Sequence, residues 1–194
     1  MPALDGQELA TVTNEAEVAW RPVRLQGRWI PEHTVFLDNR QMKGQAGFDV
    51  LTPLRLEGSN TAVVVQRGWV PRNFLERERL PAVATPAGAV EVRGLIAPPP
   101  PKLYAFAGPE SGAIRQNLDL GKFRARTGLP LVTGLSVQQT GKASEGLLRE
   151  WTEPASGVEK HYGYAFQWFA LSALIAILYV WFQFIAPRRT SRRA

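Results

Sequence analysis

The stretch that decides the fold is EKHYGYAFQWFALSALIAILYVWFQFIAPRR, residues 159–189. Within it, residues 162–185 form 24 consecutive positions without a formal charge. A helix rises about 1.5 Å per residue, so this run measures about 36 Å and can cross a hydrocarbon core of about 30 Å with some tilt. Core helices of soluble proteins rarely run this long without a charge. We therefore predict a transmembrane helix over residues 161–186.

Aromatic side chains gather at both ends of this run, while its middle is aliphatic apart from Ser172. Rings prefer the headgroup level of a bilayer, so two aromatic belts are typical of a span. The first belt is Tyr162, Tyr164, Phe166, Trp168 and Phe169, and the second is Tyr179, Trp181, Phe182 and Phe184.

The charges beyond the span predict its orientation. Pro187 ends the helix, and the basic tail, residues 187–194, holds four arginines and no acid. Positive charge flanking a span stays in the cytoplasm. We therefore expect a cytoplasmic tail, a periplasmic domain before the span, and a location in the inner membrane of a bacterium.

Export of that domain poses a problem, because the polar lead, residues 1–19, has neither the charged start nor the apolar run of a signal peptide. One solution is that the C-terminal span alone drives export. The interpretation we favour is that an upstream membrane helix is missing from this sequence, which would place both ends of the protein in the cytoplasm.

Composition excludes several classes of function. The chain has no cysteine, so disulfides, thiolate metal sites and thiol catalysis are excluded. The net charge is +6, but without the four arginines of the tail 19 basic residues face 17 acidic ones. A nearly balanced body offers no basic face for a phosphate backbone, so no nucleic-acid partner is expected.

Residues 20–139 predict a mainly β domain. Short apolar or alternating runs are bounded by turn residues, Gly27 suggests a bulge, and Pro53 suggests an edge or a break. We expect a small antiparallel β-barrel-like or folded-sheet domain with one short helix, LGKFRART, capped by Asp119 and closed by Gly128. The predicted strands cover residues 23–25 with 29–30, then 34–38, 48–56, 61–66, 90–97 and 131–138.

Two further stretches are interpreted as irregular. Residues 39–47, NRQMKGQAG, are rich in turn residues and predict a connection between strands. Residues 140–160 predict a mobile approach to the membrane.

Few side chains offer chemistry. A base–nucleophile pair would need His33 or His161, and neither a phosphate loop nor a metal-ligand spacing is present in the sequence, so no enzyme activity is expected. His33 is interpreted as a solvated turn residue. Asp38 and Arg40 could bind a ligand, but an ion pair or a turn cap is the more common role of such residues.

His161 stands at the outer mouth of the span, one position before the uncharged run. On a helix, Tyr164 and Trp168 share its face, and Gln167 lies further round. An imidazole above an aromatic wall suits an amphipathic ligand such as haem, whose iron accepts a neutral imidazole. The alternative is that a polar residue simply marks the end of the span.

Four blocks carry a resemblance to a known family. They are VRLQGRW from Val23, FLDNR from Phe36 running into GFDVLTPL from Gly47, VVVQRGWVP from Val63, and KHYGYAFQWF from Lys160. Together they resemble the surfeit locus protein one family, membrane assembly factors for cytochrome c oxidase.

The resemblance implies a domain held between two membrane helices and a role in binding or delivering haem a to the haem-copper subunit of the oxidase. It implies that His161 is the axial ligand of the haem iron and that Tyr164, Ala165, Gln167 and Trp168 line the same site. Partners implied are the haem-copper subunit, the haem a synthesis machinery and membrane lipid. The family's N-terminal helix has no counterpart in this sequence.

A different function remains open at this stage: a scaffold that stabilises the nascent oxidase subunit without binding haem. Small residues that permit close helix packing would then matter. They are Gly163, Ala165, Ala170, Ser172, Ala173 and Ala176.

Overall fold

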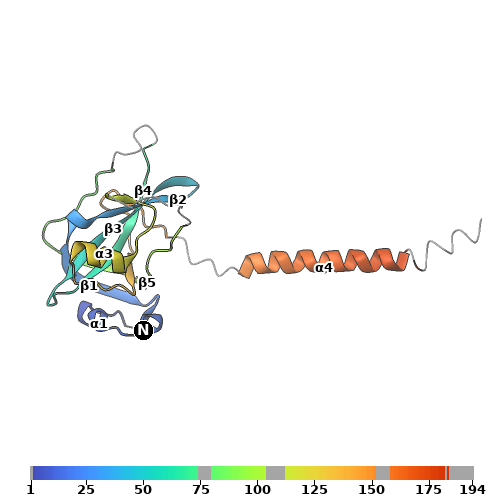
Figure 1. The fold of residues 1–194 in the computed structure, drawn as a ribbon, viewed down its shortest axis with the longest axis horizontal. Helices are drawn as coiled ribbons and strands as arrows, with labels where there is room; N and C mark the ends of the chain where they lie inside the picture. Colours follow the sequence, from blue (N-terminus) through green and yellow to red (C-terminus); the bar gives the residue numbers. More distant parts are fainter. Residues whose placement is uncertain (1, 74–79, 104–111, 152–157, 182, 184–194) are drawn as a thin grey trace, which may run out of the picture. The chain divides into compact units, whose positions relative to one another are not determined.

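The structure is a computed structural model, and it describes residues 2–73, 80–103, 112–151, 158–181 and 183. The chain divides into two compact units, Met1–Trp151 and Thr152–Ala194. The first holds all the strands that the structure describes, and the second holds the long helix. Figure 1 labels the elements of both units.

The first unit contains seven strands and several short helices in the part of the chain that is described. The strands are β1 Pro22–Trp29, β2 Val35–Met42, β3 Gln45–Leu56, β4 Ala62–Pro71, β5 Ala89–Ala97, β6 Ile114–Arg115 and β7 Ser136–Gln139. The helices are α1 Gly6–Ala10, α2 Glu15–Val18, the 3-10 turn η1 Pro31–His33 and α3 Leu120–Thr127.

Five of the strands close into a barrel. The order is β1-β5-β7-β4-β3, and β3 pairs with β1 to complete the ring, while β2 and then β6 extend the sheet from β3. Most pairs are antiparallel, and the β4–β7 and β2–β6 pairs are parallel. The prediction of a mainly β, barrel-like domain with a short helix and a terminal membrane-type helix is confirmed.

Gly27 closes the ring. It pairs with Val90 of β5 and with Leu56 of β3, so β1 bridges two strands at this residue. A Cβ atom there would overlap the carbonyl oxygen of Arg55. Glycine is therefore required by the close approach of β3, and β1 runs through it without the expected bulge.

Pro53 lies inside β3 rather than at an edge. On the edge away from β4, strand β3 changes its pairing partner at this proline. It pairs with β2 as far as Leu51 and with β1 from Leu54 onward. The carbonyl of Pro53 accepts a hydrogen bond from the Ile30 amide at this switch. Proline has no amide hydrogen to donate, and its place in a central strand is tolerated because the ladder is already interrupted there.

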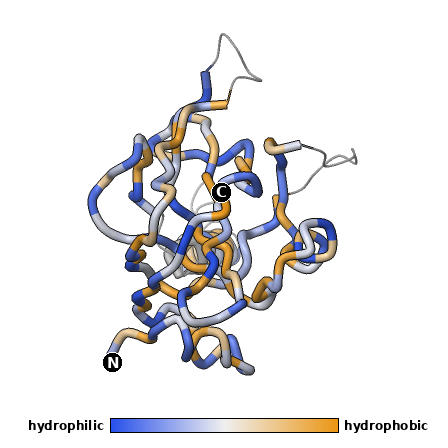
Figure 2. Tube along the Cα trace, turned by 90° about the vertical axis from the view of Figure 1, so that its left-hand side faces the viewer, coloured by the Kyte–Doolittle hydropathy of each residue, from blue (hydrophilic) through white to orange (hydrophobic). Residues whose placement is uncertain are grey.

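The core has an inner and an outer layer. The inner cluster joins residues of all five barrel strands and includes Leu9 of α1 and Val18 of α2. The outer cluster packs α3 over β2, β3 and β4. Strand β4 is buried on both faces because Val63 and Val65 belong to the inner cluster and Val64 to the outer one. Figure 2 shows how hydrophobic and hydrophilic residues alternate along the trace.

Helix α3 forms where it was predicted. The Asp119 side chain accepts a hydrogen bond from the Lys122 amide, and Gly128 takes the left-handed conformation at φ 69°. Leu120 and Phe123 are buried against the barrel. A carboxylate cap and a terminal glycine thus define both ends of this short helix.

Two stretches pack more closely than their polar sequences indicated. Residues 2–19, for which no structure was predicted, fold onto the barrel, with Leu4 bridging to Val23 and Leu9 buried. Residues 140–151, expected to be mobile, also lie on the barrel: Leu148 pairs with Trp69, and Leu147 is buried. Apolar leucines within otherwise polar segments explain both differences.

Residues 39–47 are also more regular than expected. They continue β2 and β3 into a hairpin, whose turn at Lys43 and Gly44 has φ values of 50° and 77°. Asn39, at the register shift in β2, also has a positive φ of 59°, and the polar residues between it and the turn remain in the ladder.

The second unit contains helix α4, Val158–Val180. Its segment Tyr162–Tyr179 is long and apolar enough to cross a membrane, and none of this segment is buried within the chain. Large apolar side chains along it, such as Phe166 and Ile177, are exposed. A lipid environment is the simplest way to cover such a surface.

Candidate functional site

The residues singled out in the sequence lie at the N-terminal end of α4. His161 belongs to the helix, but its side chain lies outside the described part of the structure. Tyr164 and Trp168 follow at helical spacings of three and seven, so their Cα positions share its face. Their side chains are 64% and 68% exposed, so this aromatic surface is available to a ligand or to lipid.

Gln167 and Ala165 complete the set. Gln167 is exposed and Ala165 is half-buried. The hydroxyl of Ser172 donates to the carbonyl of Trp168 at 2.9 Å, so this side chain is satisfied within the helix.

This surface fits a flat, apolar ring with a polar end. Tyr164 and Trp168 offer exposed aromatic faces, and Gln167 offers an amide next to them. An imidazole one turn earlier would supply the nitrogen that haem iron accepts. Of the described residues, no group of three or more His, Asp or Glu could hold a bare metal ion.

A second constellation lies on β4, around Arg67. Val50 of β3 pairs with Gly68, but Leu51 pairs with Gln66, so Arg67 is the extra residue of a β-bulge. A bulge takes one residue out of the ladder and re-aims its side chain. The Arg67 side chain is fully buried, and its guanidinium lies 4.6 Å from the centre of the Trp29 ring.

Arg67 binds two other segments of the chain. Its guanidinium donates to the Thr85 hydroxyl and the Ala84 carbonyl, each at 2.7 Å, and to a Glu145 carboxylate oxygen at 2.9 Å. Buried charges persist only when paired and hydrogen-bonded, and Arg67 meets both conditions. We call Arg67, Glu145 and Arg149 the arginine clasp.

Arg149 completes the clasp. Its guanidinium donates to the carbonyls of Arg67 and Lys142 at 2.8 Å and 2.7 Å, and it lies 3.4 Å from the Glu145 carboxylate. Burial lowers the pKa of Arg149, Glu145 opposes this shift, and the positive charge of Arg67 adds to it. The clasp thus fastens residues 142–149 to β4.

A third group lies beside the clasp. The indole of Trp69 donates to the Arg40 carbonyl at 3.0 Å, and the Arg40 guanidinium donates to the carbonyls of Pro101 and Gln116. Arg40 also lies 3.8 Å from the Asp49 carboxylate. Burial raises the pKa of Asp49 to about 6, and the charge of Arg40 only partly offsets it.

Asp38 and Arg40 do not form the pair considered in the sequence. Asp38 binds Arg72 at 2.7 Å, and Arg40 faces Asp49. The physical reason is the register shift in β2 between Leu37 and Arg40, which sends neighbouring side chains to different partners. An ion pair is present, but its members differ.

His33 was interpreted as a solvated turn residue, and the structure corrects this. It ends η1, is half-buried, and meets the Phe123 ring edge-on at a centroid distance of 6.4 Å. Helix α3 covers it, so packing determines its position.

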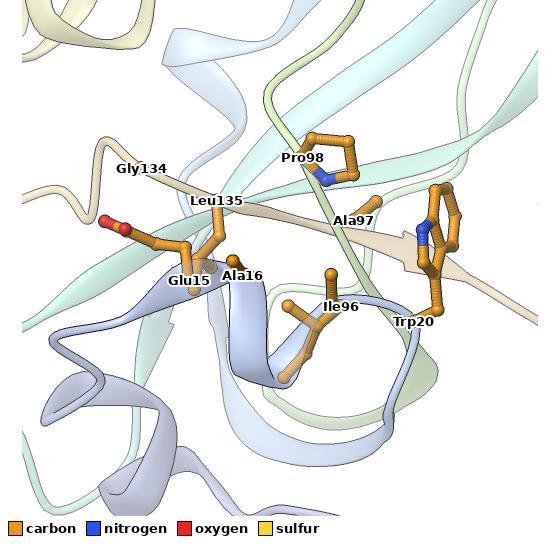
Figure 3. Close-up of a pocket in the computed structure, with 9 residues that line it drawn as sticks. Glu15, Ala16, Trp20, Ile96, Ala97, Pro98, Gly134 and Leu135 are labelled. Carbon is orange, nitrogen blue, oxygen red and sulfur yellow. The ribbon is translucent and has the colours of Figure 1, made fainter.

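A small cleft lies where α2 meets the ends of β5 and β7 (Figure 3). Its volume is 160 Å³, and Glu15, Trp20, Ile96 and Leu135 are among its lining residues. The amide of Trp20 donates to the Ile96 carbonyl at 2.6 Å. Ligand pockets usually hold about 300–1,000 Å³, so this cleft is small for a cofactor.

The arginine clasp was not predicted from the sequence. One signal was available: Arg67 is a lone charge inside the run AVVVQRGWV, whose other members are apolar or small apart from one glutamine. A charge in the middle of a buried strand is rare unless it is paired. Its partners are 17 to 82 residues away in the chain, so the sequence could not identify them.

These features together define a class: a small closed β-barrel followed by a helix able to cross a membrane, with an aromatic surface at the start of that helix. A sequence model of the SURF1 family matches residues 1–173, and the chain belongs to that family.

A curated relative, the SURF1-like protein of Drosophila melanogaster, is 24% identical over 193 residues. The matched region covers 91% of this chain and 63% of the relative, so the chain spans less than two thirds of that protein's length.

Proposed function

We propose that this protein is a membrane-anchored assembly factor for cytochrome c oxidase that binds or delivers haem a to the haem-copper subunit. Membership of the SURF1 family supports the assembly role. The observation that carries the haem part is the spacing of His161, Tyr164 and Trp168 on one face of a helix able to enter lipid.

Each residue of this set has a distinct role in the proposal. His161 provides the imidazole nitrogen for the iron, and the exposed rings of Tyr164 and Trp168 cover one face of the macrocycle. Gln167 offers an amide to polar substituents. Bound haem would supply the iron centre that the oxidase needs, while this chain only holds and orients it.

The membrane helix determines where in the cell the proposed function takes place. Helix α4 lies in the inner membrane of a bacterium, with the barrel in the periplasm and the basic tail in the cytoplasm. Haem a carries an apolar tail, so a site at the lipid boundary holds the tail in the bilayer and the ring within reach of the imidazole. The haem a synthesis machinery is the expected donor.

The test uses the full chain, produced together with haem a synthesis and purified in detergent. His161→Ala should abolish the haem absorbance that co-purifies with the parent. His33→Ala is the matched control, because it removes the other histidine of the chain, which packs on α3, and should retain haem. Equal haem content in His161→Ala and the parent would contradict the ligand assignment.

The alternative function, a scaffold without haem, makes the opposite prediction. The parent protein would then purify without haem but together with the oxidase subunit. Substitution of the small residues of α4 would weaken that co-purification.

A further inference from the structure

The seam that closes the barrel places two like charges opposite each other. Strand β1 pairs with β3 from Gly27 to Trp29, and Arg28 lies directly across from Arg55. Both side chains are exposed on the outside of the barrel. Directly opposed like charges destabilise an antiparallel pair, so an anion bound between them would be stabilising.

The described part of the chain supplies no such anion to these two arginines. Across the described residues, neither Arg28 nor Arg55 forms an ion pair or a side-chain hydrogen bond. The neighbouring pair behaves differently: Arg24 and Arg93 also face each other across β1 and β5, but both bind Glu91, at 2.7 Å and 2.8 Å.

The two unpaired arginines line a hollow. It has a volume of 170 Å³, and Gly27, Leu56, Glu57 and Ala89 complete its lining. Glu57 is the one acid of this lining, and no ion pair joins it to either arginine among the residues that the structure describes. The lining therefore keeps an excess of positive charge.

From this geometry we infer that the hollow between Arg28 and Arg55, the seam pocket, binds a phosphate-type oxyanion. A guanidinium presents a planar fork of donors that matches phosphate oxygens, and two forks can hold one phosphate group from two sides. The bound anion removes the repulsion across the seam, so binding and barrel stability are linked.

Room exists for the molecule that carries the phosphate. A larger open groove of 740 Å³ begins at Glu57, which lines both hollows, and extends along β1 past Gln26 and Arg24 to the N-terminal segment. The phosphate can belong to a soluble phosphate ester or to a lipid headgroup. Both sources share the chemistry that the seam pocket recognises.

The first experiment measures the melting temperature of the full chain by tryptophan fluorescence in a detergent with a neutral headgroup. Inorganic phosphate is compared with chloride at equal ionic strength. At about ten times the dissociation constant, phosphate should raise the melting temperature of the parent by about 3 °C, the shift expected for a domain of this size.

Arg55→Gln and Arg28→Gln should lose this shift. In chloride, both variants should melt at or above the temperature of the parent, because the repulsion is gone. Arg124→Gln is the control, since it removes an exposed arginine of α3 and leaves the seam intact. It should keep the full shift.

Three results would overturn the inference. The first is a phosphate shift in Arg55→Gln and Arg28→Gln as large as in the parent. The second is a clear loss of stability of both variants in chloride, which would mean that the arginines already have partners. The third is the absence of any shift in the parent, both with phosphate and with the lipid described next.

The source is identified by the same measurement in lipid nanodiscs without added phosphate. Discs of phosphatidylcholine are compared with discs that contain phosphatidylglycerol. Stabilisation of the parent, but not of Arg55→Gln, in the anionic discs indicates a lipid headgroup. A response to inorganic phosphate with no difference between the discs indicates a soluble phosphate compound.

Discussion

The arginine clasp shows how one residue can join distant parts of a chain. Arg67 is fully buried, and its three hydrogen-bond partners lie 17 to 78 residues away. Arg67→Ala should lower the free energy of unfolding by about 3 kcal/mol, because it empties a buried site and removes the hydrogen bonds of the guanidinium to Thr85, Ala84 and Glu145. Denaturant unfolding of the full chain in detergent, followed by tryptophan fluorescence, measures this change.

The control for this substitution is Arg93→Ala. Arg93 also forms an ion pair at 2.8 Å, but its side chain is 69% exposed. Exposed pairs contribute about 0–1 kcal/mol, so this variant should unfold almost as the parent does. Similar losses for both variants would show that burial is not what makes Arg67 important.

Asp49 makes stability depend on pH. Its pKa is raised to about 6 by burial, above the ordinary value of 3.8, so the folded state favours the protonated form. This contribution is fully present at low pH and is lost as the pH rises through about 6. Relative to Asp49→Asn, the parent should lose about 2–3 kcal/mol of stability between pH 4 and pH 7.

The measurement for Asp49 is the free energy of unfolding of parent and variant at several pH values. Only the difference between the two curves matters, since other groups titrate in both proteins. Parallel curves over this range would contradict the raised pKa. Asparagine has nearly the same size and shape as aspartate, so the variant keeps a side chain of similar volume 3.8 Å from Arg40 and changes mainly the charge.

The roles of some residues could be predicted from the sequence, and the partners of others could not. The capping role of Asp119 and Gly128 follows from local spacing, and it is confirmed. The partners of Arg40, Asp38 and Arg67 depend on strand register and on two bulges, which a sequence pattern does not specify. The proposed haem site stays a prediction that rests on the His161 block.

Among the elements, β4 depends on a glycine with an unusual backbone conformation. Gly68 has φ 155°, and a Cβ atom there would lie 2.7 Å from the Leu148 carbonyl oxygen and 2.8 Å from the Leu147 Cβ. Gly68→Ala should therefore cost about 3 kcal/mol through backbone strain and overpacking, and it should loosen residues 140–151.

Unfolding and limited proteolysis together test the Gly68 prediction. Cleavage within residues 140–151 should become faster in Gly68→Ala. Gly88→Ala is the matched control, since Gly88 has no positive φ and no atom within 4 Å of the added Cβ. If the two alanine variants behave alike, the close approach of residues 147–148 to β4 is wrong.

The extent of the elements was less predictable than their existence. The central parts of β1 to β5 and β7 follow from alternation and apolar runs, and each of them is present. The short β6 and the helices α1 and α2 were missed, because elements of two to five residues carry too few positions for a periodic pattern. Tertiary contacts decide them instead.

For the whole molecule, the first unit holds the inner cluster, the outer cluster and a third buried cluster that includes Phe48 and Leu147. The buried residues of these clusters extend no further along the chain than Leu147. We expect a fragment of residues 1–151 to unfold cooperatively without α4. A fragment of residues 1–139 should be less stable by at least about 3 kcal/mol, because it loses Leu147 and leaves Arg67 without Glu145.

Thermal unfolding of the two fragments decides between the domain end expected from the sequence, residue 139, and the end seen in the structure, residue 151. Equal stability would mean that residues 140–151 add nothing to the barrel. The sequence placed this boundary too early because TGKASEGLLREW reads as polar, although two leucines and one arginine in it have buried partners.

The clasp has a mechanical consequence. The chain leaves the barrel through residues 142–151 before it continues to α4. Tension arriving from that direction first meets the contacts of Trp151 with the Gln139 carbonyl and of Glu150 with Lys43, and then the bonds of Arg149 and Glu145 to Arg67. Several hydrogen bonds of the clasp would have to break before the force reached β4. The clasp would thus protect the pairing of β4 from force that reaches the barrel through residues 142–149.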